Sequence, residues 1–284
     1  MVWWVLLVLG VALVGWGVLS AHRLLYPERL APSVVDPLPA CSTHIVTASD
    51  GSTFEARLLT HPSPRARVLL CHGYYADLRQ VAGLAHCLRE RGYEVALIEL
   101  RGHGNRPGPC TLGIREAEDA TAVLRWMRGR DSSGSAPVGV VGLSMGAAVA
   151  FQVAACCPEV RAVVADSLYS RLFPVLQQAI RQRYHLPPIP WAWVTWWGAQ
   201  LVLRRRLASR DPVRLAPRLL QPLFVIQGGE DRRVSPRLAQ EFYERWAGPK
   251  ERWFEPGVGH VGMFARHPQE YCNRVAGFFD RTLA

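Results

Sequence analysis

The chain begins with an unbroken apolar run. Residues 2–21 contain no charged side chain and consist mainly of Trp, Val, Leu, Ala and Gly. A helix of this length spans about 30 Å, which is the thickness of the hydrocarbon core of a bilayer. Trp3 and Trp4 lie at one end and Tyr26 follows the other, as is typical of residues at membrane interfaces. We therefore predict a transmembrane anchor over residues 1–21.

The alternative to an anchor is a cleaved signal peptide. No basic residue precedes the apolar run and no clear A-x-A site follows it, so the anchor is favoured. Arg23 and Arg29 follow the run, and positive charge on that side favours a cytoplasmic catalytic domain. The next segment, residues 22–41, is rich in proline and is predicted to be a linker without helix.

From residue 42 onward, short apolar runs alternate with segments of helical periodicity. The runs are bounded by Gly, Pro or polar residues, as buried parallel strands are. They cover residues 68–71, 95–99, 138–142, 162–165 and 223–227, and a further strand is predicted at 252–255. Between them, apolar residues recur at helical spacing, for example at Val81, Leu84, Ala85 and Leu88. This alternation predicts an α/β domain over residues 42–284, with a mostly parallel sheet and helices on both faces.

A long insertion at about 170–211 interrupts the alternation. It separates two predicted strands by more than one helix requires, and a long insertion in a compact domain is often a lid. Four tryptophans and then three arginines lie within it: Trp191, Trp193, Trp196, Trp197, Arg204, Arg205 and Arg206. Three interpretations of the tryptophans remain open. They pack the insertion onto the sheet, form an aromatic cap over an apolar substrate pocket, or face the membrane.

Composition excludes several classes of protein. Apolar residues make up 49% of the chain and charged residues 20%, so intrinsic disorder is excluded. The net charge of +10 comes almost entirely from scattered arginines, which argues against a nucleic-acid partner. The seven cysteines form no CxxC pair and lie mostly in apolar segments, so we expect buried free thiols, which again favours a cytoplasmic location. No metal-ligand cluster, phosphate loop or dinucleotide motif is present in the sequence, so no metal or cofactor is implied.

A nucleophile motif follows the predicted strand at 138–142. Gly142-Leu143-Ser144-Met145-Gly146 precedes a run of small apolar residues at 147–156. G-x-S-x-G between a strand and a helix is typical of a nucleophile elbow, and the turn is so tight that side chains at either glycine would clash with backbone. Ser144 is thereby exposed above the sheet beside a helix N-terminus, whose N–H groups can hold an oxyanion.

Further motifs follow the other predicted strands. They are His72-Gly73-Tyr74, Arg101-Gly102-His103-Gly104, Asp166-Ser167, Gly228-Gly229-Glu230-Asp231 and Gly259-His260. Together with the elbow, they make residues 54–283 resemble the α/β-hydrolase superfamily. Within it, the chain is most similar to membrane-anchored bacterial hydrolases of the serine aminopeptidase-like and Bem46-like group. The resemblance implies an α/β-hydrolase fold with a helical cap insertion and the chain order nucleophile, acid, histidine.

Ser144 needs a base, because a hydroxyl is a poor nucleophile at neutral pH. His260 is the candidate among nine histidines, since it follows the last predicted strand on a glycine-rich loop. The resemblance implies Asp231 as the carboxylate that orients His260. Asp166 is the alternative acid, because some relatives place the acid there, and Glu230 is expected to point away.

The oxyanion requires two donors. The N–H of Met145, the residue after the nucleophile, is expected to supply one, and the N–H of Tyr74 the other. Tyr75 either lines the acyl pocket or only packs. By resemblance, His72 and His103 hydrogen-bond loop backbone rather than act as bases.

These residues predict a membrane-anchored serine hydrolase that cleaves an ester, thioester or amide through an acyl-enzyme on Ser144. A carboxylic ester with a small acyl or lipid-like group is favoured, because the anchor holds the site at a bilayer and the insertion is aromatic. One alternative is an aminopeptidase, which needs an acidic group in the cap, although residues 170–210 contain no Asp or Glu. The other is a non-catalytic membrane-anchored binding module, against which the intact set of Ser144, Asp231 and His260 argues.

Overall fold

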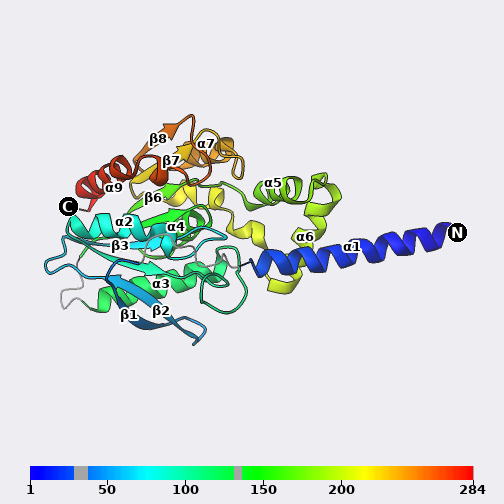
Figure 1. Cartoon of the computed structure of the whole chain (residues 1–284), viewed down its shortest axis with the longest axis horizontal. Coiled ribbons are helices and arrows are strands. Elements are labelled where there is room, and N and C mark those ends of the chain that lie inside the picture. Colours follow the sequence, from blue (N-terminus) through cyan, green and yellow to red (C-terminus); the bar gives the residue numbers. More distant parts are fainter. Residues whose placement is uncertain (29–37, 131–135, 284) are drawn as a thin grey trace.

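A mostly parallel sheet of eight strands crosses the part of the chain that the structure describes (Figure 1). The structure is a computed structural model, and it describes residues 1–28, 38–130 and 136–283. The strand order is β1-β2-β4-β3-β5-β6-β7-β8, with the antiparallel strands β1 and β2 at one edge and parallel pairing from β4 to β8. The strands are β1 (Ser42–Thr47), β2 (Thr53–Leu59), β3 (Ala66–Cys71), β4 (Tyr93–Ile98), β5 (Val138–Leu143), β6 (Val160–Asp166), β7 (Leu223–Gly228) and β8 (Lys250–Glu255). The predicted α/β fold class is confirmed.

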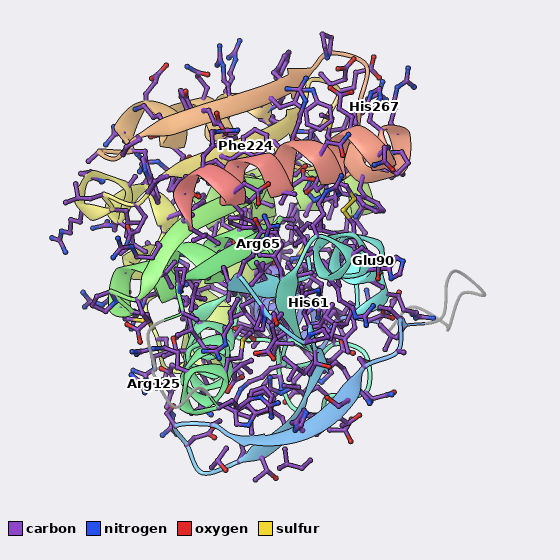
Figure 2. All side chains as sticks on the ribbon, turned by 90° about the vertical axis from the view of Figure 1, so that its left-hand side faces the viewer. His61, Arg65, Glu90, Arg125, Phe224 and His267 are labelled. Carbon is purple, nitrogen blue, oxygen red and sulfur yellow. A yellow bond between two sulfur atoms is a disulfide. The ribbon has the colours of Figure 1, made fainter. Side chains whose placement is uncertain are left out.

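Helices cover both faces of this sheet. Those connected to the sheet are α2 (Arg79–Glu90), α3 (Ile114–Gly129), α4 (Met145–Cys156), α7 (Pro236–Arg245), α8 (Met263–Arg266) and α9 (Pro268–Thr282), and three short 3₁₀ turns lie at Leu207–Arg210, Pro212–Arg214 and Ala216–Arg218. Helices α2 and α9 pack on one face, and α3 and α4 on the other. Figure 2 shows Phe224 of β7 beside α9, where its ring contacts Phe278 at a centroid distance of 5.6 Å.

Side chains of the central strands alternate between two cores. Val68 and Leu70 of β3 face the core under α2 and α9, whereas Leu69 and Cys71 face the core under α3 and α4. Because both faces are buried, β3 is buried at every position, and its one charged residue, Arg67, forms a buried ion pair with Glu94 of β4. Continuous apolar runs predicted five of the strands to within two residues, and the sixth predicted strand, at 252–255, lies within β8.

The antiparallel hairpin at the sheet edge was not among the predicted strands. Strand β2 begins with alternating exposed and buried side chains and β1 is mostly exposed, so neither has a continuous apolar run. The hairpin turn contains Gly51 at a φ of 81°, a conformation that favours glycine. The Asp50-Gly51 pair, followed by alternating polar and apolar residues from Thr53, is the signal that marks this hairpin in the sequence.

The N-terminal apolar run forms one long helix, α1 (Val2–Leu25), which projects from the domain (Figure 1). Its mean hydropathy of 2.3 over 18 residues and its length are sufficient for a membrane span. The helix continues four residues beyond the predicted boundary at residue 21, so the prediction that the linker lacks helix is wrong for residues 22–25. Pro27 lies two residues beyond the end of the helix, where proline is typical because it cannot continue a helix. The central linker, residues 29–37, lies outside the described residues, as does Arg29.

The segment between β6 and β7 contains two helices, α5 (Leu172–Tyr184) and α6 (Pro188–Leu203), which we call the helical insertion. Its tryptophans do not share one environment. Trp196 is buried against Phe173 of α5, whereas Trp197 is exposed. Packing within the domain therefore explains the buried tryptophan Trp196 but not the exposed tryptophan Trp197.

The expectation of unpaired, buried thiols is wrong for three of the seven cysteines. Cys87 of α2 and Cys272 of α9 form a disulfide across 185 residues of sequence, and Cys156 is exposed at the end of α4. Sequence spacing gave no indication of the pair, because its partners are brought together only by the packing of α2 on α9. The disulfide also removes the thiol argument for a cytoplasmic domain, since disulfides persist in oxidising compartments.

Candidate active site

Ser144 lies in a sharp turn between β5 and α4. Its backbone has a φ of 53° and a ψ of −113°, a conformation that non-glycine residues rarely adopt. The turn needs glycine on both sides. A Cβ at Gly142 would lie 2.1 Å from the carbonyl oxygen of Gly146, and a Cβ at Gly146 would lie 2.2 Å from that of Cys71. The predicted strand–turn–helix geometry of the elbow is therefore present, with Ser144 at its tip. The predicted exposure of Ser144 is wrong, because only 9% of the residue is accessible and residues of the loops and the helical insertion surround it.

The structure brings the three residues proposed as the catalytic set into one hydrogen-bonded chain. His260 Nε2 lies 3.0 Å from Ser144 Oγ, and His260 Nδ1 lies 2.7 Å from Asp231 Oδ2. A carboxylate can only accept, so Nδ1 carries the proton and Nε2 is left to accept from the serine hydroxyl. This is the tautomer in which an imidazole can take a proton from Ser144.

Asp231 is held in place by backbone donors. Its Oδ1 accepts hydrogen bonds from the N–H groups of Arg233 (3.0 Å) and Val234 (2.8 Å), and its side chain is fully buried. Gln227 donates to the other oxygen at 3.3 Å. These donors satisfy both oxygens of a buried carboxylate, which leaves Asp231 fixed toward His260.

The other acid that was considered, Asp166, has a different position. It is fully buried at the end of β6, where Ser167 Oγ donates to its Oδ1 (2.9 Å) and Tyr271 Oη donates to its Oδ2 (3.1 Å). Ser167 Oγ in turn accepts the N–H of Val261 at 2.9 Å, directly after His260. Asp166 therefore braces the loop that carries His260 and does not hydrogen-bond the imidazole. Burial raises the pKa of the Asp166 carboxyl to about 6.

The two backbone N–H groups proposed to bind the oxyanion belong to segments that lie next to Ser144. Met145 is the first residue of α4, so its N–H has no partner within the helix. The loop after β3 passes the serine closely, since a Cβ on Gly73 would lie 3.4 Å from the Cβ of Ser144. The N–H of Gly73 itself is taken by Gln80 Oε1 at 2.7 Å, which leaves the next amide, that of Tyr74, as the available donor of this loop.

His72 and His103 hydrogen-bond backbone, as the resemblance implied. His72 Nδ1 lies 2.8 Å from the carbonyl oxygen of Gly73, and its Nε2 accepts the N–H of Leu100 at 3.0 Å. His103 Nδ1 lies 2.8 Å from the carbonyl oxygen of Arg101. These contacts fix the loops after β3 and β4 against one another. Both histidines have structural partners and neither faces Ser144 through a hydrogen bond.

Two cavities meet at Ser144 and His260. The first has a volume of about 500 Å³, and mainly apolar side chains of α5, α6, α1 and the loops line it, among them Leu24, Tyr75, Leu172, Val175, Leu176 and Trp196. The second, of about 340 Å³, is lined mainly by polar groups, including Gln80, Glu230 and Arg232. Tyr75 thus lines the apolar cavity rather than only packing. The serine lies between an apolar chamber and a polar one.

Three residues of this site escaped the sequence argument. Leu24 belongs to the N-terminal helix, Gln80 holds the loop of Tyr74, and Ser167 holds the loop of His260. Ser167 stands in the motif Asp166-Ser167, so its position could have been inferred from the elbow-like turn after β6. Nothing in the sequence marks Leu24 or Gln80. Among the described residues, no group of three or more His, Cys, Asp or Glu side chains is arranged to hold a metal ion.

A model of the alpha/beta hydrolase family matches residues 68–274, which is more than half of the chain. The chain belongs to this family. The match spans the motifs after β3, β4, β5, β6 and β7 and includes the positions of Ser144, Asp231 and His260.

Individual relatives agree with this assignment. The chain is 32% identical over 261 residues to an uncharacterized protein of Mycobacterium tuberculosis, Rv2307c, covering 88% of this chain and 85% of that protein. It is 40% identical over 98 residues to the lipase LipV of the same organism, covering 34% of this chain and 35% of LipV. Among solved structures, the esterase Pf2001 of Pyrococcus furiosus has the same fold, with a TM-score of 0.76 at 24% identity over 92% of this chain and 99% of that chain.

Proposed function

We propose that this protein is a serine hydrolase that cleaves a carboxylic ester through an acyl-enzyme. The observation that carries the proposal is the distance of 3.0 Å between His260 Nε2 and Ser144 Oγ, with Asp231 on the other ring nitrogen. In the first half of the reaction Ser144 Oγ attacks the ester carbonyl carbon while its proton passes to His260 Nε2. The tetrahedral intermediate then collapses, the alcohol leaves with that proton, and the acyl group remains on Ser144.

The second half repeats these steps with water. His260 takes a proton from water, the hydroxide attacks the acyl carbonyl, and the proton returns to Ser144 Oγ as the carboxylic acid leaves. Asp231 holds the imidazole in the required tautomer and stabilises its cation. The N–H groups of Tyr74 and Met145 donate to the oxygen that becomes negatively charged in both tetrahedral intermediates.

An ester with an apolar acyl group is the favoured substrate. The cavity of about 500 Å³ beside Ser144 has the apolar walls that an acyl chain requires, and the polar chamber of about 340 Å³ suits an alcohol leaving group. The lipase and esterase named above support ester hydrolysis as the reaction class.

We further propose that α1 anchors the enzyme in a membrane and is retained. Its last residues belong to the catalytic domain: Ala21 and Leu25 are fully buried, and Leu25 O accepts the N–H of Cys110 at 2.7 Å. Cleavage near residue 21, as for a signal peptide, would expose this packing. Arg23 favours a cytoplasmic domain by its charge, and the disulfide between Cys87 and Cys272 favours the opposite side.

An aminopeptidase function has less support. It requires an acidic group near the site that binds the substrate's amine, and the helical insertion contributes none. Glu28 borders the apolar cavity, but its carboxylate pairs with Arg183 at 3.0 Å. The amine of a peptide would have to displace that arginine.

A serine-reactive probe tests the proposed mechanism directly. A fluorophosphonate should label the full-length protein and should not label the Ser144→Ala variant. A His260→Ala variant should react much more slowly, since the hydroxyl would then lack its base. Labelling that persists in Ser144→Ala would place the nucleophile elsewhere, and a wild-type protein that remains unlabelled would favour the binding module.

Substrate turnover then distinguishes ester from amide. We expect hydrolysis of p-nitrophenyl esters with medium acyl chains and no comparable hydrolysis of aminoacyl anilides. A preference for anilides by kcat/KM would contradict the ester assignment while leaving the acyl-enzyme mechanism intact.

A further inference from the structure

Helix α6 of the helical insertion has an apolar surface that the domain does not cover. It contains no charged residue between Pro188 and Leu203. Trp193, Trp197 and Leu201 recur every four residues, so they follow one face of the helix. This face is exposed, with 64% of Trp197 and 80% of Leu201 accessible to solvent. A monomeric soluble protein rarely leaves large apolar side chains exposed in a contiguous row.

The neighbouring face of α6 packs on the N-terminal helix α1 through small and hydroxyl-bearing residues. A Cβ at Gly198 would lie 2.7 Å from the carbonyl oxygen of Gly17, so the two backbones approach closely. The hydroxyls of Ser20 and Thr195 lie 2.7 Å apart in a buried hydrogen bond. Small residues at the contact and a hydrogen bond between helices are features by which helices associate within membranes.

The position of this contact along α1 fixes the depth of α6. At about 1.5 Å per residue, Gly17 lies about 22 Å and Ser20 about 27 Å from Val2, so both fall inside a span of about 30 Å that begins at Val2. Figure 1 shows α6 against the C-terminal half of α1, while the N-terminal half projects beyond the domain. If α1 spans a bilayer, α6 lies at the boundary where α1 leaves it.

Charged residues around α6 match an anionic lipid surface. Arg204, Arg205 and Arg206 follow the helix directly and are exposed. Among the described residues, no carboxylate forms an ion pair with any of these three arginines, and residues 170–210 contain no Asp or Glu. Arginines beside an apolar helix face are typical of segments that lie in a lipid interface.

We infer that α6 is a second membrane-binding element, which lies in the lipid interface beside α1. Trp193, Trp197 and Leu201 contact lipid, and the arginines at 204–206 contact anionic headgroups. The inference rests on the proposed anchoring by α1 and does not depend on catalysis. Its consequence is structural: Trp196, on the inner side of α6, and Leu24, at the end of α1, both line the apolar cavity at Ser144. The cavity is therefore built against the bilayer surface, where an ester with a long acyl chain resides.

Photolabelling by lipid tests this placement without any measure of activity. The full-length chain is reconstituted in phosphatidylcholine–phosphatidylglycerol vesicles that contain a phospholipid with a diazirine in its acyl chain. The experiment is done with the wild type and with Ser144→Ala, because the variant cannot hydrolyse the probe. Trypsin cleavage after Arg183 and Arg204 releases α6 as the single peptide 184–204, and cleavage after Arg23 releases α1 as peptide 1–23. Peptide 219–232, released by cleavage after Arg218 and Arg232, is the control, because it carries Leu220, which is 71% exposed, and none of its residues lines the apolar cavity.

We expect lipid adducts on 1–23 and on 184–204 and none above background on 219–232. Adducts confined to peptide 1–23 would overturn the inference. The exposed face of α6 would then bind a protein partner or a second copy of the chain instead of lipid. Absence of adducts from 1–23 as well would overturn the proposed anchor. Both outcomes are independent of whether the protein hydrolyses esters.

A paired variant tests the functional consequence. Trp197→Ser combined with Leu201→Ser should lower the rate on a long-chain ester in vesicles by about fivefold or more, because two apolar side chains no longer hold the cavity at the lipid. The rate on a soluble short-chain ester should be unchanged, since neither residue lines the cavity. Leu220→Ser, at a residue 71% exposed elsewhere, is the matched control and should alter neither rate. An equal loss on both esters, or no loss on either, would contradict the inference.

Discussion

The hydroxyl of Tyr74 donates a hydrogen bond of 2.8 Å to the carbonyl oxygen of Leu24. Tyr74 carries one of the two amides proposed to bind the oxyanion, and Leu24 lies one residue before the end of the N-terminal helix α1. The apolar helix and the catalytic loop are therefore joined directly. Burial raises the pKa of Tyr74 well above its usual value, so the phenol remains a donor at all physiological pH values.

Replacing Tyr74 by Phe removes this link and retains the backbone donor. We expect the free energy of unfolding to fall by about 1 kcal/mol, the usual contribution of one hydrogen bond, and kcat to fall less than about tenfold. Thermal unfolding in detergent and ester hydrolysis measure the two effects. Tyr243→Phe, which removes a bond to Lys250 far from the site, is the control. A loss of kcat as large as in Ser144→Ala would mean that the phenol itself takes part in the reaction.

Asp231 and Asp166 are two buried carboxylates near His260, and only Asp231 accepts its hydrogen bond. We expect Asp231→Asn to lower kcat by about 10⁴-fold, because the amide favours the wrong tautomer of the imidazole. Ester hydrolysis at saturating substrate measures this loss. Glu255→Gln, at the end of β8 and outside both cavities, is the control and should retain activity near that of wild type. If Asp166→Asn had the larger effect on kcat, the assignment of the acid would have to be reversed.

The strands that position the site were predictable because they are buried on both faces. Each is a short apolar run bounded by glycine or polar residues, and the catalytic motifs follow directly at their carboxyl ends. The contact between Ser144 and His260, 116 positions apart, was predictable from chain order through the family resemblance. That contact depends on fold topology, which sequence motifs record well.

Contacts between loops were not predictable in the same way. The bond from Gly73 to Gln80 joins a loop to α2, and the bond from Val261 to Ser167 joins two loops. Both depend on the exact path of a loop, and its polar groups have many potential partners. The packing of α1 on α6 was also missed. An apolar run predicts the environment of a helix but does not specify which protein surface the helix contacts. The hairpin of β1 and β2 was missed for another reason, because it lacks the continuous apolar runs on which the strand predictions relied.

The pH dependence of stability should report the buried Asp166. Its pKa is raised to about 6 in the folded protein from 3.8, so the folded state binds the proton more tightly than the unfolded state does. The contribution of protonated Asp166 to the free energy of unfolding is fully present below about pH 4 and is lost as the pH rises to about 6. The total loss is about 3 kcal/mol. Thermal unfolding between pH 4 and 8 measures this change, and it should be absent from Asp166→Asn. Identical profiles for the two proteins would show that Asp166 ionises normally.

The elbow provides the sharpest test of the backbone geometry. Gly146→Ala places a methyl group 2.2 Å from the carbonyl oxygen of Cys71 and 2.6 Å from that of His72, and neither backbone atom can move without disturbing β3. We expect a strongly destabilised protein without probe labelling at Ser144, because the turn can no longer form. Gly129→Ala is the matched control, since a Cβ there meets no atom within 4 Å. Because Gly129 lies at the end of α3, Gly129→Ala should leave the free energy of unfolding unchanged or raise it by about 0.5 kcal/mol. Alanine lowers the conformational entropy of the unfolded chain, which is the cause of such an increase. A Gly146→Ala protein that folds and labels like the control would mean that the turn at Ser144 is less tight than the structure describes.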